Sequence, residues 1–208
     1  GKFVSSEPAV NRMVTQMAPG FPVPGSDFAA SGLAAVWATD NTREALFDAL
    51  TRKEIYATTG NRITVRLFGG WNFAPADVKR ADYAAVGYSK GVPMGGTLNA
   101  APRSKAPVLM ITATKDPDEA NLDRIQVIKG WLDASGKTHE KIYDVALSGK
   151  RRAASEAGKT PLVGSTVDIA NATYSNSICA ESLDAVWPDP RSEEHASELQ
   201  SRFGISYA

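Results

Sequence analysis

Four segments of the chain have the composition and alternation of β-strands, and this pattern constrains the fold more than any other feature. They are Arg62–Leu67, Val108–Thr114, Arg124–Trp131 and His139–Val145. Successive side chains of a strand point to opposite faces, so alternating apolar and polar residues are typical of a half-buried strand. The sequence DASG between the last two segments predicts a β-hairpin. Residues 164–178 add one or two further strands, and several short strands with regular turns predict a sandwich.

The strongest helical signal precedes these strands, over Thr42–Lys53. Asn41 is a good N-cap, and Glu44 three residues later completes a capping box. One face of the predicted helix is apolar, with Leu46, Phe47 and Leu50. Arg52 and Lys53 fall in the last predicted turn, where cations favour the helix dipole.

The residues before this helix are rich in proline, glycine, serine and alanine. Three closely spaced prolines in Pro19–Gly32 predict an irregular, extended segment. Met13 and Met17 lie at helical spacing, so a short helix over Val10–Met17 is expected, with both methionines used for packing. The expected fold class is α+β, mostly β, with one or two N-terminal helices leading into an antiparallel β-sandwich-like domain.

The 208 residues are enough for one large or two small domains, and the 23 Lys and Arg balance the 23 Asp and Glu. This balance argues against a nucleic-acid-binding protein, which needs a basic surface. The one dense basic run, Lys150-Arg151-Arg152, is interpreted as a solvated loop. No apolar stretch approaches the roughly 20 residues that span a bilayer, and no signal peptide is visible at Gly1. The single cysteine, Cys179, excludes an intramolecular disulfide and a cysteine-based zinc cluster.

No catalytic, cofactor-binding or metal residue is predicted from these side chains. Metal-dependent hydrolysis usually needs several His, Asp and Glu side chains around one cation. The chain has two histidines, His139 and His195, and no HxH, HExxH or DxH motif. His139 lies in an alternating strand and is interpreted as a strand residue without a ligand role. A serine hydrolase is not indicated either, because no GxSxG motif is present and nothing ties a serine to His139.

Three other motifs have both a functional and a structural interpretation. Gly91–Leu98 is glycine-rich but lacks the GK[ST] ending of a phosphate loop, so a tight turn between strands is favoured. An acidic cluster departs from the spacing of a calcium loop, so a solvated loop is favoured. The cluster comprises Asp116, Asp118, Glu119 and Asp123. Trp71 and Trp131, each next to glycine, could bind sugars, although packing is the more common role of such aromatics.

Long phrases of the sequence resemble a known family. They are SGLAAVWATDNTREALFDALTRKEIYATTGNRITVRLFGGW (Ser31–Trp71), GVPMGGTL, KDPDEANLDRIQVIKGWLDASGKTHEKIYDVALSG (Lys115–Gly149), and STVDIANATYSNSI running into LDAVWPDP. In this order they resemble the C-terminal part of the bacterial family called domain of unknown function 3604, over most of Ser31–Pro190. That family looks related to metal-dependent phosphoesterases of the polymerase-and-histidinol-phosphatase type. Its predicted HxH and DxH ligands lie in an N-terminal barrel-like domain.

The resemblance implies a division of the chain. Residues 1–60 would be the incomplete tail end of the hydrolase domain, and residues 61–190 a β-sandwich-like C-terminal region. The metal motifs are absent here, so no site residue carries over. A divalent metal is therefore expected only in the intact protein, whose N-terminal catalytic domain would be the partner in cis. Family members often look exported, which implies a periplasmic or secreted location.

The last segment, Arg191–Ala208, differs in composition from the strands before it, because it is rich in Ser, Glu, Gln and Arg and has few apolar residues. It contains His195. It reads RSEEHASELQSRFGISYA and follows WPDP. The phrase resembles a translated sequencing-adapter read-through of the kind attached to unrelated metagenomic proteins. We therefore expect residues 191–208 to be non-native. The alternative is a native polar C-terminal helix, for which the propensity is adequate.

Two functions follow as expectations. The first is a non-catalytic C-terminal fragment of a metal-dependent hydrolase, phosphoesterase-like in the intact protein, which buttresses the catalytic domain. The fragment would itself be inactive because it lacks the ligands. The alternative is a β-sandwich binding module for a carbohydrate or a protein partner. In that case Trp71, Trp131 and Tyr143 would form an exposed aromatic face.

Overall fold

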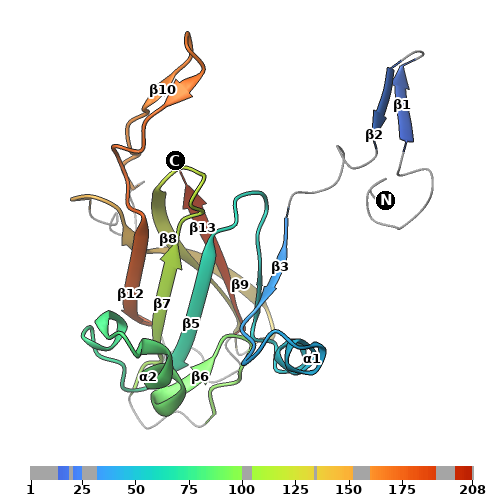
Figure 1. The fold of residues 1–208 in the computed structure, drawn as a ribbon. Coiled ribbons are helices and arrows are strands. Elements are labelled where there is room, and N and C mark those ends of the chain that lie inside the picture. Colours follow the sequence, from blue (N-terminus) through green and yellow to red (C-terminus); the bar gives the residue numbers. More distant parts are fainter. Residues whose placement is uncertain are drawn as a thin grey trace.

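The described part of the chain forms a four-stranded and a three-stranded antiparallel sheet, three two-stranded ribbons and a few short helices (Figure 1). The computed structural model describes residues 14–18, 21–24, 32–99, 105–133, 135–151, 160–190 and 200–207. The elements are β1 (Val14–Ala18), β2 (Phe21–Pro24), β3 (Ala34–Val36), α1 (Arg43–Thr51), β4 (Ile55–Ala57), β5 (Thr64–Gly70), η3 (Asp77–Lys79), α2 (Tyr83–Lys90), β6 (Gly91–Pro93), β7 (Val108–Thr114), β8 (Leu122–Leu132), β9 (Thr138–Leu147), β10 (Val167–Asp168), β11 (Thr173–Tyr174), β12 (Ser182–Pro188) and β13 (Gln200–Tyr207). The expected α+β, mostly β class is confirmed.

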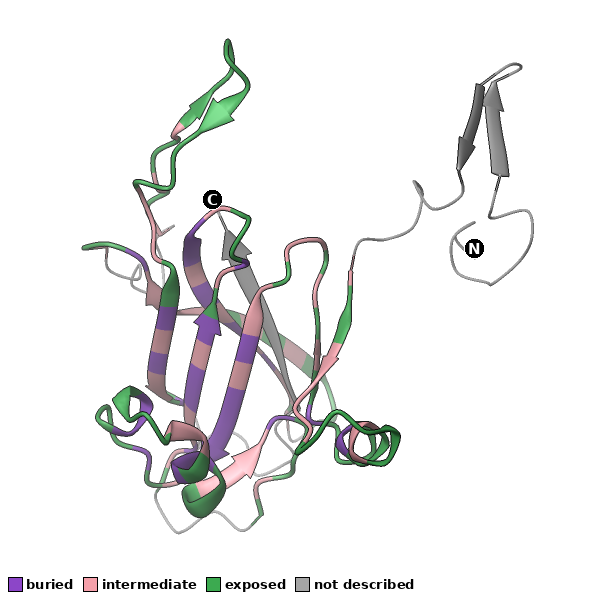
Figure 2. Ribbon diagram, in the orientation of Figure 1, coloured by how far each residue is buried: buried purple, intermediate pink, exposed green. Residues whose placement is uncertain are grey.

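The two main sheets pack face to face and enclose the larger core. One has the strand order β12-β7-β5-β6, and the other has the order β13-β8-β9. In the first sheet, Val65 pairs with Ala113, which pairs with Leu183, so all three side chains lie on one face. This face meets Ile125 and Val127 of β8 in a single buried cluster. Figure 2 shows the buried residues concentrated on these strands, and burial of this apolar area drives the sheets together.

The opposite face of the four-stranded sheet is covered by α2 and η3. Phe68 and Met110, adjacent on β5 and β7, are almost fully buried there, and they form a second cluster with Val78 of η3. Gly87 of α2 lies directly over the Phe68 ring, where a Cβ atom would come within 2.4 Å of the ring carbon Cγ. A larger residue at position 87 would therefore push α2 off the sheet.

An ion pair holds this helical cover together. Asp77 of η3 accepts a hydrogen bond from the Ala74 backbone N–H at 2.8 Å, and both of its oxygens lie 2.8 Å from Lys90 Nζ at the end of α2. The Ala74 hydrogen bond, followed by the bond from Lys90, lowers the pKa of the Asp77 carboxyl below its ordinary value of 3.8.

This lowered pKa predicts an acid-sensitive contribution to stability. A carboxyl whose folded pKa is depressed stabilises the fold above its unfolded pKa, and the effect is lost as the pH falls towards the folded value. We expect Asp77→Asn to lower the free energy of unfolding at pH 7, and the difference from the wild type to shrink below about pH 4. Urea titrations of both proteins at pH 7, 4 and 3 measure this. A difference that stays constant with pH would contradict the assignment.

Several local expectations are confirmed and others are wrong. β7 has the expected bounds, and β8 and β9 form the expected hairpin, with Trp131 opposite His139. The helix expected over Val10–Met17 is wrong from Val14 onwards, where β1 pairs with β2; residues 10–13 lie outside the described part. The helix α2 was not expected, because the segment was interpreted as entirely β. None of the described helices has the length and apolar character needed to cross a membrane.

The C-terminal segment contains a strand. β13 pairs antiparallel with β8 over most of its length, so the alternative of a polar helix is wrong for Gln200–Tyr207. Residues 191–199, which include His195, lie outside the described part. Whether Arg191–Ala208 is native is a separate question, and its non-native origin stays a prediction.

Candidate functional site

The residues considered for chemistry in the sequence are engaged in structural contacts. His139 stacks on Trp131 with ring centroids 5.3 Å apart, and its Nε2 lies 2.8 Å from Asp133 Oδ2. Asp133 also accepts hydrogen bonds from Ser135, and these, followed by the His139 contact, lower the pKa of its carboxyl. His139 therefore closes the β8–β9 hairpin.

The solvated loop expected for the acidic cluster is wrong for Asp116 and Asp123, which are buried and have separate partners, whereas Asp118 and Glu119 are exposed. Asp116 accepts hydrogen bonds from the backbone N–H groups of Arg62 and Asp118, at 2.6 and 3.2 Å, and these lower the pKa of its carboxyl. Asp123 instead pairs with Arg124 and Arg151. In the part of the chain that the structure describes, no three His, Cys, Asp or Glu side chains are grouped to hold a metal ion.

The glycine-rich segment 91–98 contains the expected tight turn, in which the Gly96 backbone N–H donates to the Pro93 carbonyl at 3.0 Å. Gly91–Pro93 is β6 at the edge of the sheet, and the turn that follows contains Gly95 with φ +77°. A Cβ atom on Gly95 would lie 2.2 Å from the Lys53 carbonyl oxygen. Only glycine fits this backbone and this contact, and the close approach holds the end of α1 against the sheet.

α1 begins and ends within a residue or two of the expected bounds, but with different caps. Its N-cap is Thr42, whose Oγ1 accepts from the Ala45 backbone N–H at 3.2 Å, and not Asn41. Arg52 is the C-cap and Lys53 has φ 61°, so neither lies in the last helical turn as expected. The two ends fix the rotation of α1 about its own axis, and this rotation decides which side chains face the sheet and which face solvent.

The outer side of α1 exposes two large apolar side chains. Ala49 is fully buried against the body, whereas Phe47 is 68% and Leu50 48% exposed. The two lie three residues apart and therefore on one side of the helix. Leu46, the third member of the expected apolar face, is half-buried.

The neighbouring β3–β4 ribbon adds further exposed apolar groups. Val36 pairs with Ile55, and Ala35 pairs with Tyr56, so Tyr56 and Ile55 point to opposite faces. Tyr56 packs on the core between the two sheets, whereas Ile55 is exposed, as is Leu33 just before β3. We call Leu33, Phe47, Leu50 and Ile55, on these adjoining elements, the flank surface.

A polar network anchors this unit to the sandwich. Glu54, which follows α1, is only 3% exposed; it accepts from Arg52 Nε at 3.0 Å and from the Tyr88 hydroxyl of α2. Burial, followed by this hydrogen bond, raises the pKa of Tyr88 above its ordinary value. The Tyr88 hydroxyl also accepts from Arg66 Nη2 at 3.1 Å.

Arg66 extends this network to β3. Its guanidinium lies 4.4 Å from the Trp37 ring centroid, a cation–π distance, and Trp37 Nε1 donates to the Val65 carbonyl at 3.0 Å. α1, α2 and β5 are thereby joined through the buried Glu54 carboxylate and the more exposed polar groups of Arg52, Tyr88 and Arg66. A buried carboxylate needs such partners, because leaving it unpaired would cost free energy. This network therefore holds α1, which carries part of the flank surface, in a fixed position on the sandwich.

The three aromatic residues expected to form an exposed face are not exposed. Trp71, Trp131 and Tyr143 are all half-buried. Tyr143 lies opposite Val127 in the register and packs on Trp187 of β12, 5.1 Å away between ring centroids. The Tyr143 hydroxyl is shielded from solvent. This ring therefore contributes to the packing between the two sheets.

The fold defines the chain as an antiparallel β-sandwich protein with helices on the outer face of one sheet and a helix–ribbon unit on its flank. The sequence model of the family described as "Protein of unknown function (DUF3604)" matches residues 1–198, and the chain belongs to this family. The match begins before Ser31 and continues past Pro190, so it is longer than the resemblance noted in the sequence. Neither a curated protein nor a solved structure matches the chain.

Proposed function

We propose that this chain is a non-catalytic part of a metal-dependent hydrolase, phosphoesterase-like in the intact protein. In this proposal the sandwich buttresses an N-terminal catalytic domain in cis. The flank surface belongs to the segment that closes this domain, and it packs against the rest of the domain. The carrying observation is that Phe47 and Leu50 are exposed on a helix whose ends are fixed by Thr42 and by the Gly95 contact. Exposed apolar groups gathered on a rigid element are typical of a surface that packs against another domain.

The division of the chain is part of this proposal. Residues 1–60 would close the catalytic domain, residues 61–190 would form the supporting sandwich, and residues 191–208 would be non-native. The packing of Tyr56 and Trp37 on the core between the sheets supports a firm junction near residue 60. A firm junction would hold the sandwich and the catalytic domain in a fixed relative orientation. A divalent metal in that domain and an exported location belong to the same proposal.

The absence of activity in this chain can be tested directly. We expect no hydrolysis of p-nitrophenyl phosphate or bis-p-nitrophenyl phosphate above the buffer rate when the purified chain is supplied with Mn²⁺ or Zn²⁺. The reason is that the proposal assigns every metal ligand to the missing domain. Turnover that follows the protein through purification and stops with EDTA would overturn the proposal.

The role of the flank surface is tested in the longer reading frame. Resequencing the source locus upstream of Gly1 and across Pro190-Arg191 is expected to recover HxH and DxH motifs upstream and β sequence in place of the tail. In that protein, Phe47→Ser with Leu50→Ser should lower both metal-dependent hydrolysis and the melting temperature. Ile169→Ser, at a residue 90% exposed near the β10–β11 hairpin, is the matched control and should change neither. A frame that truly begins near Gly1 would refute the proposal.

A further inference from the structure

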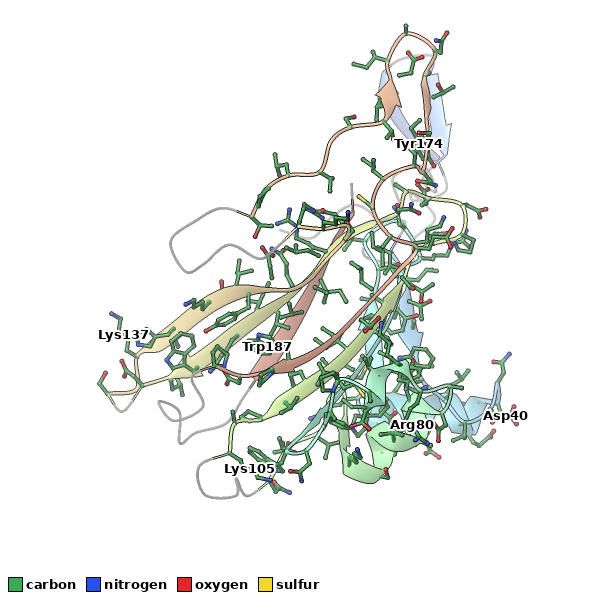
Figure 3. All side chains as sticks on the ribbon, turned by 90° about the vertical axis from the view of Figure 1, so that its left-hand side faces the viewer. Asp40, Arg80, Lys105, Lys137, Tyr174 and Trp187 are labelled. Atoms are coloured by element: carbon green, nitrogen blue, oxygen red, sulfur yellow. The ribbon has the colours of Figure 1, made fainter. Side chains whose placement is uncertain are left out.

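A cleft lies between the start of β8 and the segment that carries the β10–β11 hairpin. It has a volume of about 680 Å³, within the range of ligand-binding pockets. Its lining is rich in amide and hydroxyl side chains and includes Asn61, Asn121, Gln126, Tyr174 and Asn176. Figure 3 shows Tyr174 on the projecting hairpin, far from Asp40, which precedes α1. The cleft is therefore separate from the flank surface.

Two charged groups of the lining, Asp123 and Arg124, form an ion pair, and the third charged group of the lining is Glu119. Asp123 accepts from Arg124 Nε at 2.6 Å and also pairs with Arg151. Arg124 Nη1 lies 3.5 Å from Asp144 Oδ2. An anionic ligand would have to displace these carboxylates from Arg124, which is costly, and it would also meet the carboxylate of Glu119 in the lining. The chemistry of the cleft therefore favours a neutral ligand.

Several polar groups of the lining have unused hydrogen-bonding capacity. Asn121 is 7% exposed and its Nδ2 donates to the Asn176 and Ile178 carbonyls at 3.0 and 2.9 Å. Its Oδ1 is buried and has no hydrogen-bond partner among the described residues. Within the same part of the chain, neither the Asn61 amide nor the Tyr174 hydroxyl forms a side-chain hydrogen bond. Asn121 Oδ1 is shielded from solvent, so the Asn61 amide and the Tyr174 hydroxyl are the groups that can bond a ligand in the cleft.

We propose that this cleft binds a neutral oligosaccharide. Amide and hydroxyl side chains match the donors and acceptors of sugar hydroxyls, and the Tyr174 ring, half exposed in the lining, offers a flat apolar surface for the C–H face of a sugar ring. Asn61 and Tyr174 contact the sugar from opposite sides of the cleft, the sandwich and the hairpin segment. This binding goes beyond the proposed buttressing function and does not depend on it.

Isothermal titration calorimetry with a panel of neutral hexasaccharides tests the proposal. The panel comprises cellohexaose, maltohexaose, laminarihexaose, mannohexaose and chitohexaose, with inorganic phosphate as the anionic comparison. We expect at least one hexasaccharide to bind and phosphate not to bind. Asn61→Ala and Tyr174→Ala should each weaken binding about tenfold, since each removes one polar or stacking contact. Ile169→Ala, outside the lining, should leave the affinity unchanged.

A second variant guards against loss of folding. A Cβ atom on Gly164, which lines the cleft, would meet nothing within 4 Å, so Gly164→Trp places its bulk beside the cleft without a backbone clash. This variant should melt like the wild type and lose binding, whereas Gly164→Ala should retain it. Failure of every hexasaccharide to bind, binding of phosphate alone, or binding that survives all three lining variants would overturn the proposal.

Discussion

Replacing Lys129 with methionine should lower the free energy of unfolding by about 3–5 kcal/mol, because it removes a buried cation that is hydrogen-bonded to a buried carboxylate. Lys129 on β8 is 1% exposed, and its Nζ lies 2.6 and 2.8 Å from the two oxygens of Asp189, which is 3% exposed. Asp189 follows β12, so the pair joins the two sheets across the core. Guanidinium titration at pH 7 measures the loss.

A double variant separates the ion pair from the volume of its side chains. Lys129→Met with Asp189→Leu removes both charges together, and we expect most of the lost stability to return, since an apolar pair of similar size avoids the cost of burying charge. Arg80→Met is the control. It breaks the Arg80–Asp82 pair, in which both side chains are more than half exposed, and should change stability by less than about 1 kcal/mol. A Lys129→Met loss as small as this would contradict the prediction.

Two phenylalanines should behave in opposite ways. Phe68→Ala removes a ring that is 1% exposed and packs against Met110 and α2, so we expect a loss of about 3–5 kcal/mol. Phe47→Ala removes a ring on the flank surface and should change the stability of this chain by about 0.5 kcal/mol or less. Thermal and urea unfolding of the two variants measure the contrast. A large loss for Phe47→Ala would show that the ring is already packed within the chain and would count against the flank surface as an interface.

The β-hairpin was the most predictable part of the fold. β8 and β9 alternate along their length and are joined by a short polar turn, so local sequence determines both the strands and their pairing. β7 was also found in full, because its run of apolar and β-branched residues is bounded by Pro107 before it and by Lys115 after it. In these segments the strand propensity of the local sequence agrees with the sheet in which the segment is paired.

α2 was missed because its stability comes from contacts distant in sequence. Its short sequence YAAVGYSK has a central glycine, which weakens a helix considered alone. In the fold that glycine is what allows α2 to lie on Phe68. The N-cap of α1 was misplaced by one residue, because Asn41 and Thr42 both suit the position, and in the fold the Thr42 side chain is the one that accepts from the Ala45 N–H.

The candidate surfaces were only partly predictable. The apolar helix face that includes Phe47 and Leu50 was visible in the sequence, and the structure shows that both side chains are exposed. The Glu54–Tyr88–Arg66 network and the cleft beside Asn121 were not expected. Both join residues that are brought together only by the tertiary fold: Glu54 and Tyr88 are 34 positions apart, and Asn121 and Asn176 are 55 apart.

The position of β13 matters for how the protein behaves if residues 191–208 are removed as non-native. β13 occupies one side of β8, so its removal would leave the backbone N–H and C=O groups of that long strand open to solvent. An open strand edge is a template on which another chain can add a strand. A trimmed version would therefore tend to form dimers or fibrils through β8, unless another part of the full-length protein occupies the same place.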